Sequence, residues 1–315
     1  MPCYHPIKAY RSKALTVNGK RSLVFNQKDS TGDVLEIPCG QCIGCRLERS
    51  RQWAVRISNE ASLYDQNCFI TLTYAPEYLP EGGSLVLEHF QKFLKRLRKK
   101  YGKSIRFFHC GEYGEQLGRP HYHACILNFD FPDKYHYRTT ARGDRIFRSP
   151  SLEQLWPFGN SEIGTVTFES AAYVARYCTK KVTGSLAENH YSRLDAETGE
   201  IIQLKPEYVT MSRRPGIGAP WLEKFSRDVY NHDLMVSRGH VMRPPRFYDN
   251  RFEILDADRF ASVQRSRLEK QIDDFKTGNL SKKLRDNTHE RRIVKERVHE
   301  LTVNASLNRN YEKKE

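Results

Sequence analysis

The sequence lacks any long apolar run. No uninterrupted stretch approaches the roughly 18 apolar residues that a helix needs to span a bilayer. The first six residues also lack the apolar core of a secretory signal peptide. We therefore expect no membrane partner and a cytoplasmic location. In that compartment the eight cysteines should be free thiols or metal ligands rather than disulfides.

Acidic residues are scarce relative to basic ones. The 315 residues include 52 Lys and Arg but 38 Asp and Glu, which gives a formal net charge of +14. A basic chain favours a polyanionic partner, either nucleic acid or an anionic membrane, although a basic surface can also serve solubility alone. Hydrophobic residues make up 38% of the chain, enough for a packed core in part of it.

The order of the expected elements indicates an α+β fold. Runs of apolar, β-branched and aromatic residues predict strands at 69–74, 105–110, 121–127 and 163–168. Apolar spacing of three and four residues predicts helices at 46–63, 85–101 and 171–182. Ser170 is the expected N-cap of the last helix. A helix followed by the order β-α-β-β-β-α fits one central antiparallel sheet with helices on one face.

Composition divides the chain into four segments. We expect an irregular, cysteine-rich segment at 1–45, a core at 46–184 and a basic accessory region at 185–250. The tail at 251–315 is charged, and we expect it to be helical or partly disordered. Within the core, residues 130–160 are polar and are typical of an irregular insertion.

Two histidines separated by one residue can chelate a divalent metal. Alternate side chains of a strand share a face, so His121 and His123 should point the same way. Glu112 ends the preceding strand and can supply a third ligand, with Glu115 or His109 as substitutes. Two imidazoles and a carboxylate suit a metal that binds substrate oxygens. The alternatives are ordinary histidines and a solvated carboxylate at the end of a hairpin.

Tyr173, Tyr177 and Lys181 form a row along one side of the predicted helix, at positions i, i+4 and i+8. An apolar stripe runs beside this row. The helix can therefore bury the stripe and leave both phenols at the edge of the buried face. The alternative is that both tyrosines are core residues. A tyrosine hydroxyl titrates at about 10, and a cation such as Lys181 or Lys180 favours the phenolate nucleophile. With a metal on the scissile phosphate, two tyrosines would allow two successive strand transfers.

Three cysteines at two-residue gaps, Cys39, Cys42 and Cys45, resemble a metal knuckle. Structural zinc takes four ligands of this soft kind. Cys3 is the natural fourth ligand and His5 a substitute. An iron–sulfur cluster and buried free cysteines are the alternatives.

Together these motifs resemble the HUH endonuclease superfamily and, more closely, the replication initiation proteins of gokushovirus-type microviruses. The matching pieces are residues 38–46, 69–74, 118–123, 155–159, 173–181 and 212–218. Each piece is weak alone. Their order is specific, with the histidine pair about 50 residues before the paired tyrosines.

The resemblance implies an HUH-type antiparallel sheet, with Mg²⁺ or Mn²⁺ bound by His121 and His123. It implies that Tyr173 and Tyr177 are both nucleophiles. The protein would nick the viral strand at the origin, hold the 5′ end as a phosphotyrosine, and later rejoin the displaced strand into a circle. This activity would start rolling-circle replication of a small circular single-stranded DNA genome in the cytoplasm of a bacterial host.

The sequence contains no phosphate-binding loop of the type Gly-x-x-x-x-Gly-Lys-Ser/Thr. Unwinding of the duplex would therefore need a host helicase, and synthesis a host DNA polymerase. The DNA partner would be single-stranded and supercoiled circular DNA at the replication origin. Basic side chains should hold DNA phosphates without reading sequence. The candidates are Arg119, Arg176, Lys180, Arg213 and Arg214.

Two other functions fit parts of the sequence. A transposase or relaxase would use the same histidine pair and tyrosine chemistry. A non-catalytic, zinc-stabilised DNA-binding protein explains the charge and the cysteines. It gives no reason for paired tyrosines that follow a histidine pair.

Overall fold

The computed structural model describes residues 3–16, 21–114, 117–141, 143–177, 187–194, 199–279, 281 and 285–311. The chain forms two compact units. Unit 1 contains Met1–Glu48 and Glu269–Glu315, and unit 2 contains Arg49–Leu268. Within the described residues, no helix has both the length and the apolar character needed to cross a membrane.

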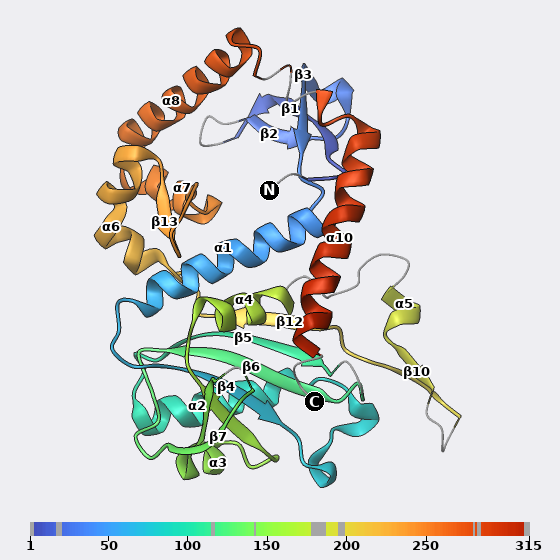
Figure 1. Cartoon of the computed structure of the whole chain (residues 1–315), viewed down its shortest axis with the longest axis vertical. Helices are drawn as coiled ribbons and strands as arrows, with labels where there is room; N and C mark the ends of the chain where they lie inside the picture. The colour runs from blue at the N-terminus through green and yellow to red at the C-terminus, as the bar shows by residue number, and fades with distance from the viewer. Residues whose placement is uncertain are drawn as a thin grey trace. The chain divides into compact units, whose positions relative to one another are not determined.

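A seven-stranded antiparallel sheet forms the centre of unit 2 (Figure 1). Its strands, in spatial order, are β12 (Tyr208–Met211), β5 (Arg106–Tyr113), β6 (Pro120–Leu127), β4 (Asn67–Thr73), β9 (Ser161–Gly164), β8 (Arg145–Arg148) and β7 (Tyr135–Thr139). β6 lies between β5 and β4. The register places His121 opposite Glu112 of β5, and His123 opposite Thr71 of β4.

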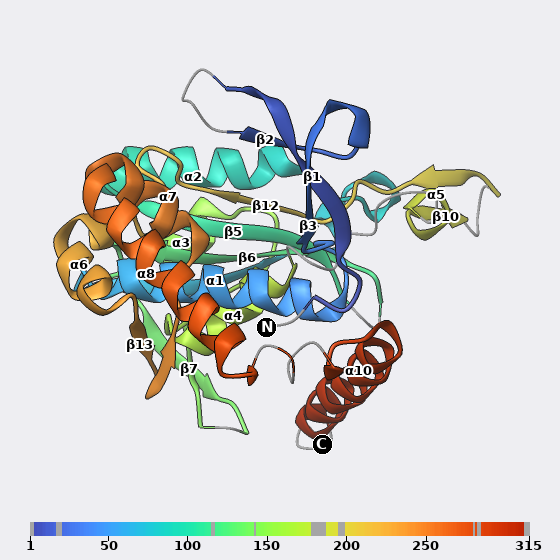
Figure 2. The ribbon, with the colours of Figure 1, turned by 90° about the horizontal axis from the view of Figure 1, so that it is seen from above.

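Helices cover both faces of this sheet (Figures 1 and 2). On one face, α2 (Leu87–Tyr101) buries Phe90 and Leu97 in a cluster with Ile70 and Tyr122. On the other face, α4 (Phe168–Tyr177) and the part of α1 (Ile43–Ala61) that belongs to unit 2 pack on β5 and β6. The prediction of helices on one face is therefore wrong. Seven of the eight residues of β6 are buried, because both of its faces are covered.

The segment 130–160, predicted to be an irregular insertion, contains regular structure. β7 and β8 form a hairpin that extends the sheet, and α3 (Pro150–Leu155) follows. β7 is exposed along its whole length. It therefore has no buried apolar residue to mark it as a strand.

The boundary between β9 and α4 also differs from the prediction. The strand predicted at 163–168 ends at Gly164, and the helix predicted at 171–182 begins at Phe168. Thr167 N–H donates to Ser170 Oγ at 2.8 Å, and Ser170 N–H donates to Thr167 Oγ1 at 3.1 Å. This reciprocal pair is a capping box, so Thr167 is the N-cap and the prediction of Ser170 is wrong. Residues 178–186 lie outside the described residues.

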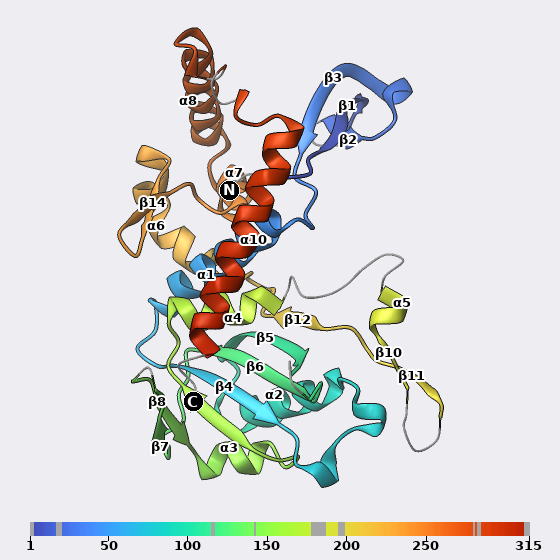
Figure 3. The same cartoon turned by 45° about the vertical axis from the view of Figure 1, so that its right-hand side comes forward.

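The rest of unit 2 adds helices and short hairpins. These elements are η2 (Pro76–Tyr78), η3 (Glu81–Gly83), α5 (Ala187–His190), β10 (Ser192–Leu194), β11 (Ile201–Gln203), α6 (Ala219–His232), β13 (Met235–Ser237), β14 (His240–Met242) and α7 (Arg246–Leu255). β10 and β11 form a ribbon that extends away from the sheet (Figure 3). α6 and α7 build a separate apolar cluster with Val55 of α1 and Phe260 of α8 (Ala257–Lys276).

Unit 1 contains a three-stranded antiparallel sheet and a long helix. The strands, in spatial order, are β2 (Arg21–Val24), β1 (Ile7–Leu15) and β3 (Ser30–Ile37), with η1 (Gln27–Asp29) before β3. The prediction of an irregular segment at 1–45 is wrong for these residues. Most side chains of these strands are exposed, so the strands have no buried apolar face that the sequence pattern could indicate. In the tail, the described residues include α8 and α10 (His289–Tyr311).

The motif at 155–159 fixes the end of β4. Trp156 is fully buried, and its Nε1–H donates to the carbonyl oxygen of Thr73 at 3.0 Å. Gly159 has φ +150, and a Cβ there would lie 2.2 Å from the backbone nitrogen of Ala75. Only glycine therefore fits this position without moving the backbone.

We expect Gly159→Ala to lower the free energy of unfolding by roughly 3 kcal/mol or more, because the new methyl group collides with backbone. The matched control is Gly102→Ala, which has φ +111 and no atom within 4 Å of a built Cβ. It adds conformational strain alone and should cost about 1 kcal/mol. Urea unfolding followed by circular dichroism measures both variants. An equal loss of unfolding free energy in both variants would show that the backbone moves away from the new methyl group at no energetic cost.

Candidate functional site

Glu112, His121 and His123 converge on the face of the sheet that α4 covers. Each offers one metal-ligand atom, and these atoms all lie within 4.8 Å of one another. Glu112 Oε1 is 2.9 Å from His121 Nε2 and 2.8 Å from His123 Nε2. The β5–β6 hairpin produces this arrangement, because Glu112 pairs directly with His121, and His123 lies two residues further along the same face.

Partners on the far side of each imidazole hold the two rings. His121 Nδ1 lies 3.1 Å from the carbonyl oxygen of Arg119, and His123 Nδ1 lies 3.0 Å from Thr71 Oγ1. A carbonyl oxygen only accepts, so His121 Nδ1 carries a proton and Nε2 faces Glu112. Phe69 stacks on His123 with ring centroids 5.6 Å apart. Sequence reasoning missed Thr71, whose position beside His123 follows only from the β4–β6 register.

The environment of Glu112 keeps it ionised. The side chain is 1% exposed, and this burial raises its pKa. The interactions with His121 and His123 act in the opposite direction, and the net effect holds the pKa of Glu112 below its ordinary value. At neutral pH the cluster therefore contains a carboxylate.

Tyr173 brings a phenol to this cluster from α4. Its Oη donates to Glu112 Oε1 at 3.4 Å, and its ring meets His123 edge-on with centroids 5.1 Å apart. The side chain stays accessible to a substrate, because the residue is 36% exposed. α4 is held in this orientation by Ala171, Val174 and Ala175, all fully buried.

The other residues of the predicted tyrosine row are only partly described. Tyr177 is the last residue of α4, one turn after Tyr173, and its side chain lies outside the described residues. Lys180 and Lys181 also lie outside them. Their predicted roles therefore stay predictions.

The substitute ligands at the histidine cluster have different outcomes. His109 lies on the opposite face of the sheet, where its ring stacks on Phe90 with centroids 3.4 Å apart and its Nδ1 is 2.9 Å from Thr210 Oγ1. Burial lowers the pKa of His109 well below its ordinary value, so the ring is neutral. His109 as a substitute ligand is therefore wrong. Glu115 lies outside the described residues.

The basic residues predicted to hold DNA differ in their surroundings. Arg119 donates from Nη2 to the carbonyl oxygen of Tyr74 at 2.9 Å, which ties the start of β6 to the end of β4. Arg176 is half-buried on α4. Arg213 and Arg214 are exposed in the turn after β12, where they are accessible to a polyanion.

The predicted cysteine knuckle comes together in unit 1. The sulfur atoms of Cys3, Cys39, Cys42 and Cys45 all lie within 4.8 Å of one another. His5, the substitute fourth ligand, contacts Glu296 of α10 instead. All described cysteines are free thiols. Those of unit 2 are buried in the sheet as core residues: Cys68, Cys110 and Cys125.

Comparison with known proteins gives consistent matches. Residues 67–182 match the family described as Replication-associated protein ORF2/G2P. The chain is 32% identical to the replication-associated protein VP4 of Bdellovibrio phage phiMH2K, over 79% of this chain and 76% of that protein. It is 31% identical to the replication-associated protein ORF2 of Spiroplasma virus 4, over 82% of this chain and 83% of that protein.

A shorter match joins this chain to the replication-associated protein ORF4 of Chlamydia phage 1, at 34% identity over 46% of this chain and 38% of that protein. No solved structure matches. The interval 67–182 that matches the family contains Glu112, both histidines of the cluster and Tyr173. The chain therefore belongs to the replication-associated proteins of microviruses.

Proposed function

We propose that this protein initiates rolling-circle replication of a viral genome by nicking one DNA strand through tyrosine attack. The observation that carries the proposal is the Tyr173 phenol, 3.4 Å from Glu112 in a cluster whose three ligand atoms lie within 4.8 Å of one another. This is the chemistry of the HUH endonucleases that the sequence resembles. The relatives are named as replication-associated proteins of phages, which favours an initiator over a transposase or relaxase.

A divalent cation, Mg²⁺ or Mn²⁺, fits the cluster of Glu112, His121 and His123. In a neutral His121 ring the single proton is on Nδ1, so Nε2 and the Glu112 carboxylate are two acceptors 2.9 Å apart. Two facing acceptors need a proton or a cation between them. Two imidazoles and one carboxylate also leave positions for phosphate oxygens. When bound, the metal would polarise the scissile phosphate and stabilise its developing charge.

The Tyr173 phenol would attack the scissile phosphorus. The Oη–P bond forms and the P–O3′ bond breaks, and the departing 3′ oxygen takes a proton from water. The phenol proton passes to water, and Glu112 Oε1, 3.4 Å from the phenol, orients the hydroxyl. The phosphotyrosine keeps the bond energy of the phosphodiester, so attack by a 3′-hydroxyl rejoins the strand. Tyr177, one turn later on α4, would supply the second transfer.

The substrate would be single-stranded or supercoiled circular DNA at the replication origin. The net charge of +14 and the exposed Arg213 and Arg214 suit contacts with phosphates. Unwinding and synthesis would fall to a helicase and a DNA polymerase of the bacterial host, in its cytoplasm.

The test is incubation with end-labelled single-stranded origin DNA and Mn²⁺, followed by denaturing gel electrophoresis. We expect a protein-linked band that carries the fragment on the 3′ side of the cut, and its loss in EDTA. A salt-sensitive complex without a covalent band would instead support the non-catalytic DNA-binding alternative.

We expect Thr71→Val to weaken metal binding by about 10- to 100-fold, because valine keeps the β-branched shape but removes the hydroxyl that holds His123. Thr73→Val is the matched control on the same face of β4. It pairs with His121 in the β4–β6 register, and its hydroxyl donates to the carbonyl oxygen of Asn160 at 3.3 Å. Titration with Mn²⁺ followed by electron paramagnetic resonance measures both. Equal affinities would show that Thr71 does not position the ring.

A further inference from the structure

The four sulfur atoms of unit 1 have the spacing of a tetrahedral metal site. Cys39 Sγ is 4.0 Å from Cys45 Sγ, and Cys42 Sγ is 3.9 Å from Cys3 Sγ. A disulfide bond would be far shorter, at about 2.05 Å. Thiolates bound at about 2.3 Å around a tetrahedral Zn²⁺ lie about 3.8 Å apart. An iron–sulfur cluster places several iron and sulfide atoms between its thiolates and needs a wider ring of ligands.

Backbone amides donate to three of these sulfur atoms. Cys39 Sγ accepts from the N–H groups of Gln41 and Cys42, at 3.5 and 3.3 Å. Cys39 N–H donates to Cys3 Sγ at 3.2 Å, and Tyr4 N–H donates to Cys42 Sγ at 3.4 Å. A thiol is a weak acceptor, whereas a metal-bound thiolate carries negative charge that such donors stabilise. The amides are therefore arranged for thiolates.

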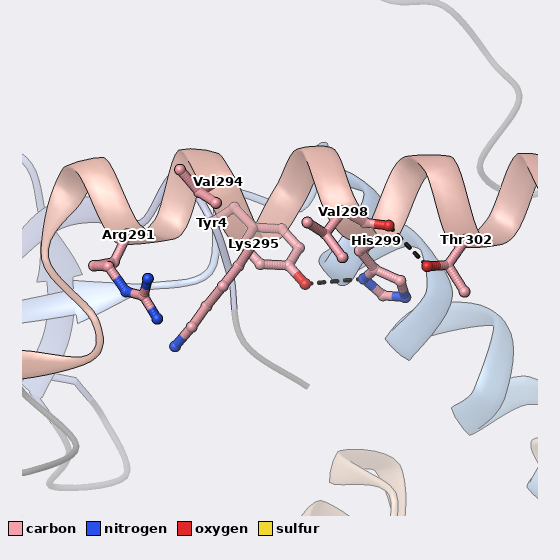
Figure 4. Close-up of a pocket in the computed structure, with 7 residues that line it drawn as sticks. All are labelled: Tyr4, Arg291, Val294, Lys295, Val298, His299 and Thr302. Carbon is pink, nitrogen blue, oxygen red and sulfur yellow. Dashed lines mark hydrogen bonds between the residues drawn. The ribbon is translucent and has the colours of Figure 1, made fainter.

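The two residues after Cys3 contact α10. Tyr4 Oη is 2.9 Å from His299 Nδ1, and His5 contacts Glu296. Tyr4 is 5% exposed and lines a pocket whose other residues all come from α10 (Figure 4). Tyr4 directly follows Cys3 in the chain, so the position of Cys3 determines where Tyr4 contacts α10.

We propose that Cys3, Cys39, Cys42 and Cys45 bind one structural Zn²⁺, and that this ion anchors Tyr4 and His5 to α10. The sheet of unit 1 has little core of its own. Among the residues of β1, β2 and β3, the buried ones are Ala9, Ser12 and Ser30. A structural metal replaces a hydrophobic core in small folds of this kind.

The first test measures zinc in the purified full-length chain by mass spectrometry. All variants carry His121→Ala and His123→Ala, so that the other cluster binds no metal. We expect about one zinc ion per chain. Adding Cys39→Ser with Cys42→Ser should lower this content at least roughly tenfold. Cys68→Ala, which removes a buried thiol of unit 2, should leave it unchanged. Full zinc content in the double serine variant, or the visible absorption of an iron–sulfur cluster, would overturn the proposal.

The second test needs no cysteine variant and therefore stands even if those variants fail to fold. The starting protein is the chain that carries His121→Ala and His123→Ala. Removing its zinc with a chelator should speed amide hydrogen exchange in α10 by roughly tenfold or more and leave exchange in β5 and β6 unchanged. Tyr4→Phe removes the bond to His299 and should speed exchange in α10 while zinc stays bound. Unchanged exchange in α10 after zinc removal would refute the anchoring role.

Discussion

Tyr173→Phe is expected to lower the rate of the first nick at least roughly 10³-fold, because it removes the attacking hydroxyl. Phenylalanine keeps the ring that meets His123 edge-on, so the fold and the cluster should be preserved. Tyr177→Phe should slow the second transfer more than the first, and the double variant should form no covalent product. Nicking of a supercoiled origin plasmid with Mn²⁺ measures each step.

Tyr135→Phe is the matched control for these variants. Tyr135 is an exposed tyrosine on β7, at the far edge of the sheet from β5. Its replacement should leave the nicking rate unchanged. Nicking by the double variant of Tyr173 and Tyr177 would identify water or another residue as the nucleophile, and the covalent mechanism would then be wrong.

His121→Ala with His123→Ala should abolish metal-dependent nicking, and Glu112→Gln should lower its rate by roughly 10²-fold or more. The histidine variant removes two ligand atoms, whereas glutamine keeps the shape of Glu112 and removes its charge. Fluorescence anisotropy in EDTA should show unchanged affinity for single-stranded DNA, because phosphate contacts from other residues supply that binding.

His136→Ala is the control for the histidine variants, because His136 is exposed on β7 and lies 3.0 Å from Thr139 Oγ1 of its own hairpin. It should nick at the parent rate. Full activity of Glu112→Gln would show that Glu112 is not a metal ligand. Full activity of the double histidine variant would show that nicking does not need the metal.

The cluster of Glu112, His121 and His123 was predictable from the sequence because it is local. Two neighbouring strands joined by a short connection form an antiparallel hairpin. Residues at equal distances from its turn then lie opposite each other on the two strands. Tyr173 was predictable as a candidate from helical spacing. Its contact with Glu112 was not, because that contact depends on how α4 packs on β5 and β6.

The features that the sequence did not reveal depend on long-range pairing or on exposed strands. Thr71 reaches His123 through strands that are about 50 residues apart in the chain. β7 and the strands of unit 1 are mostly exposed, so they contain few of the buried apolar residues that mark a half-buried strand. The second helical layer over the sheet includes α1, which comes before all seven strands in the chain. The order of the elements does not show that α1 packs on β5 and β6.

The most direct test of the central claim is identification of the amino acid joined to DNA. The protein would be reacted with single-stranded origin DNA and Mn²⁺, digested with protease and nuclease, and its peptides sequenced by mass spectrometry. We predict a nucleotide attached through its 5′ phosphate to Tyr173 or Tyr177, and no such peptide in EDTA. A nick with a free 5′ phosphate, or attachment to any other residue, would contradict the account.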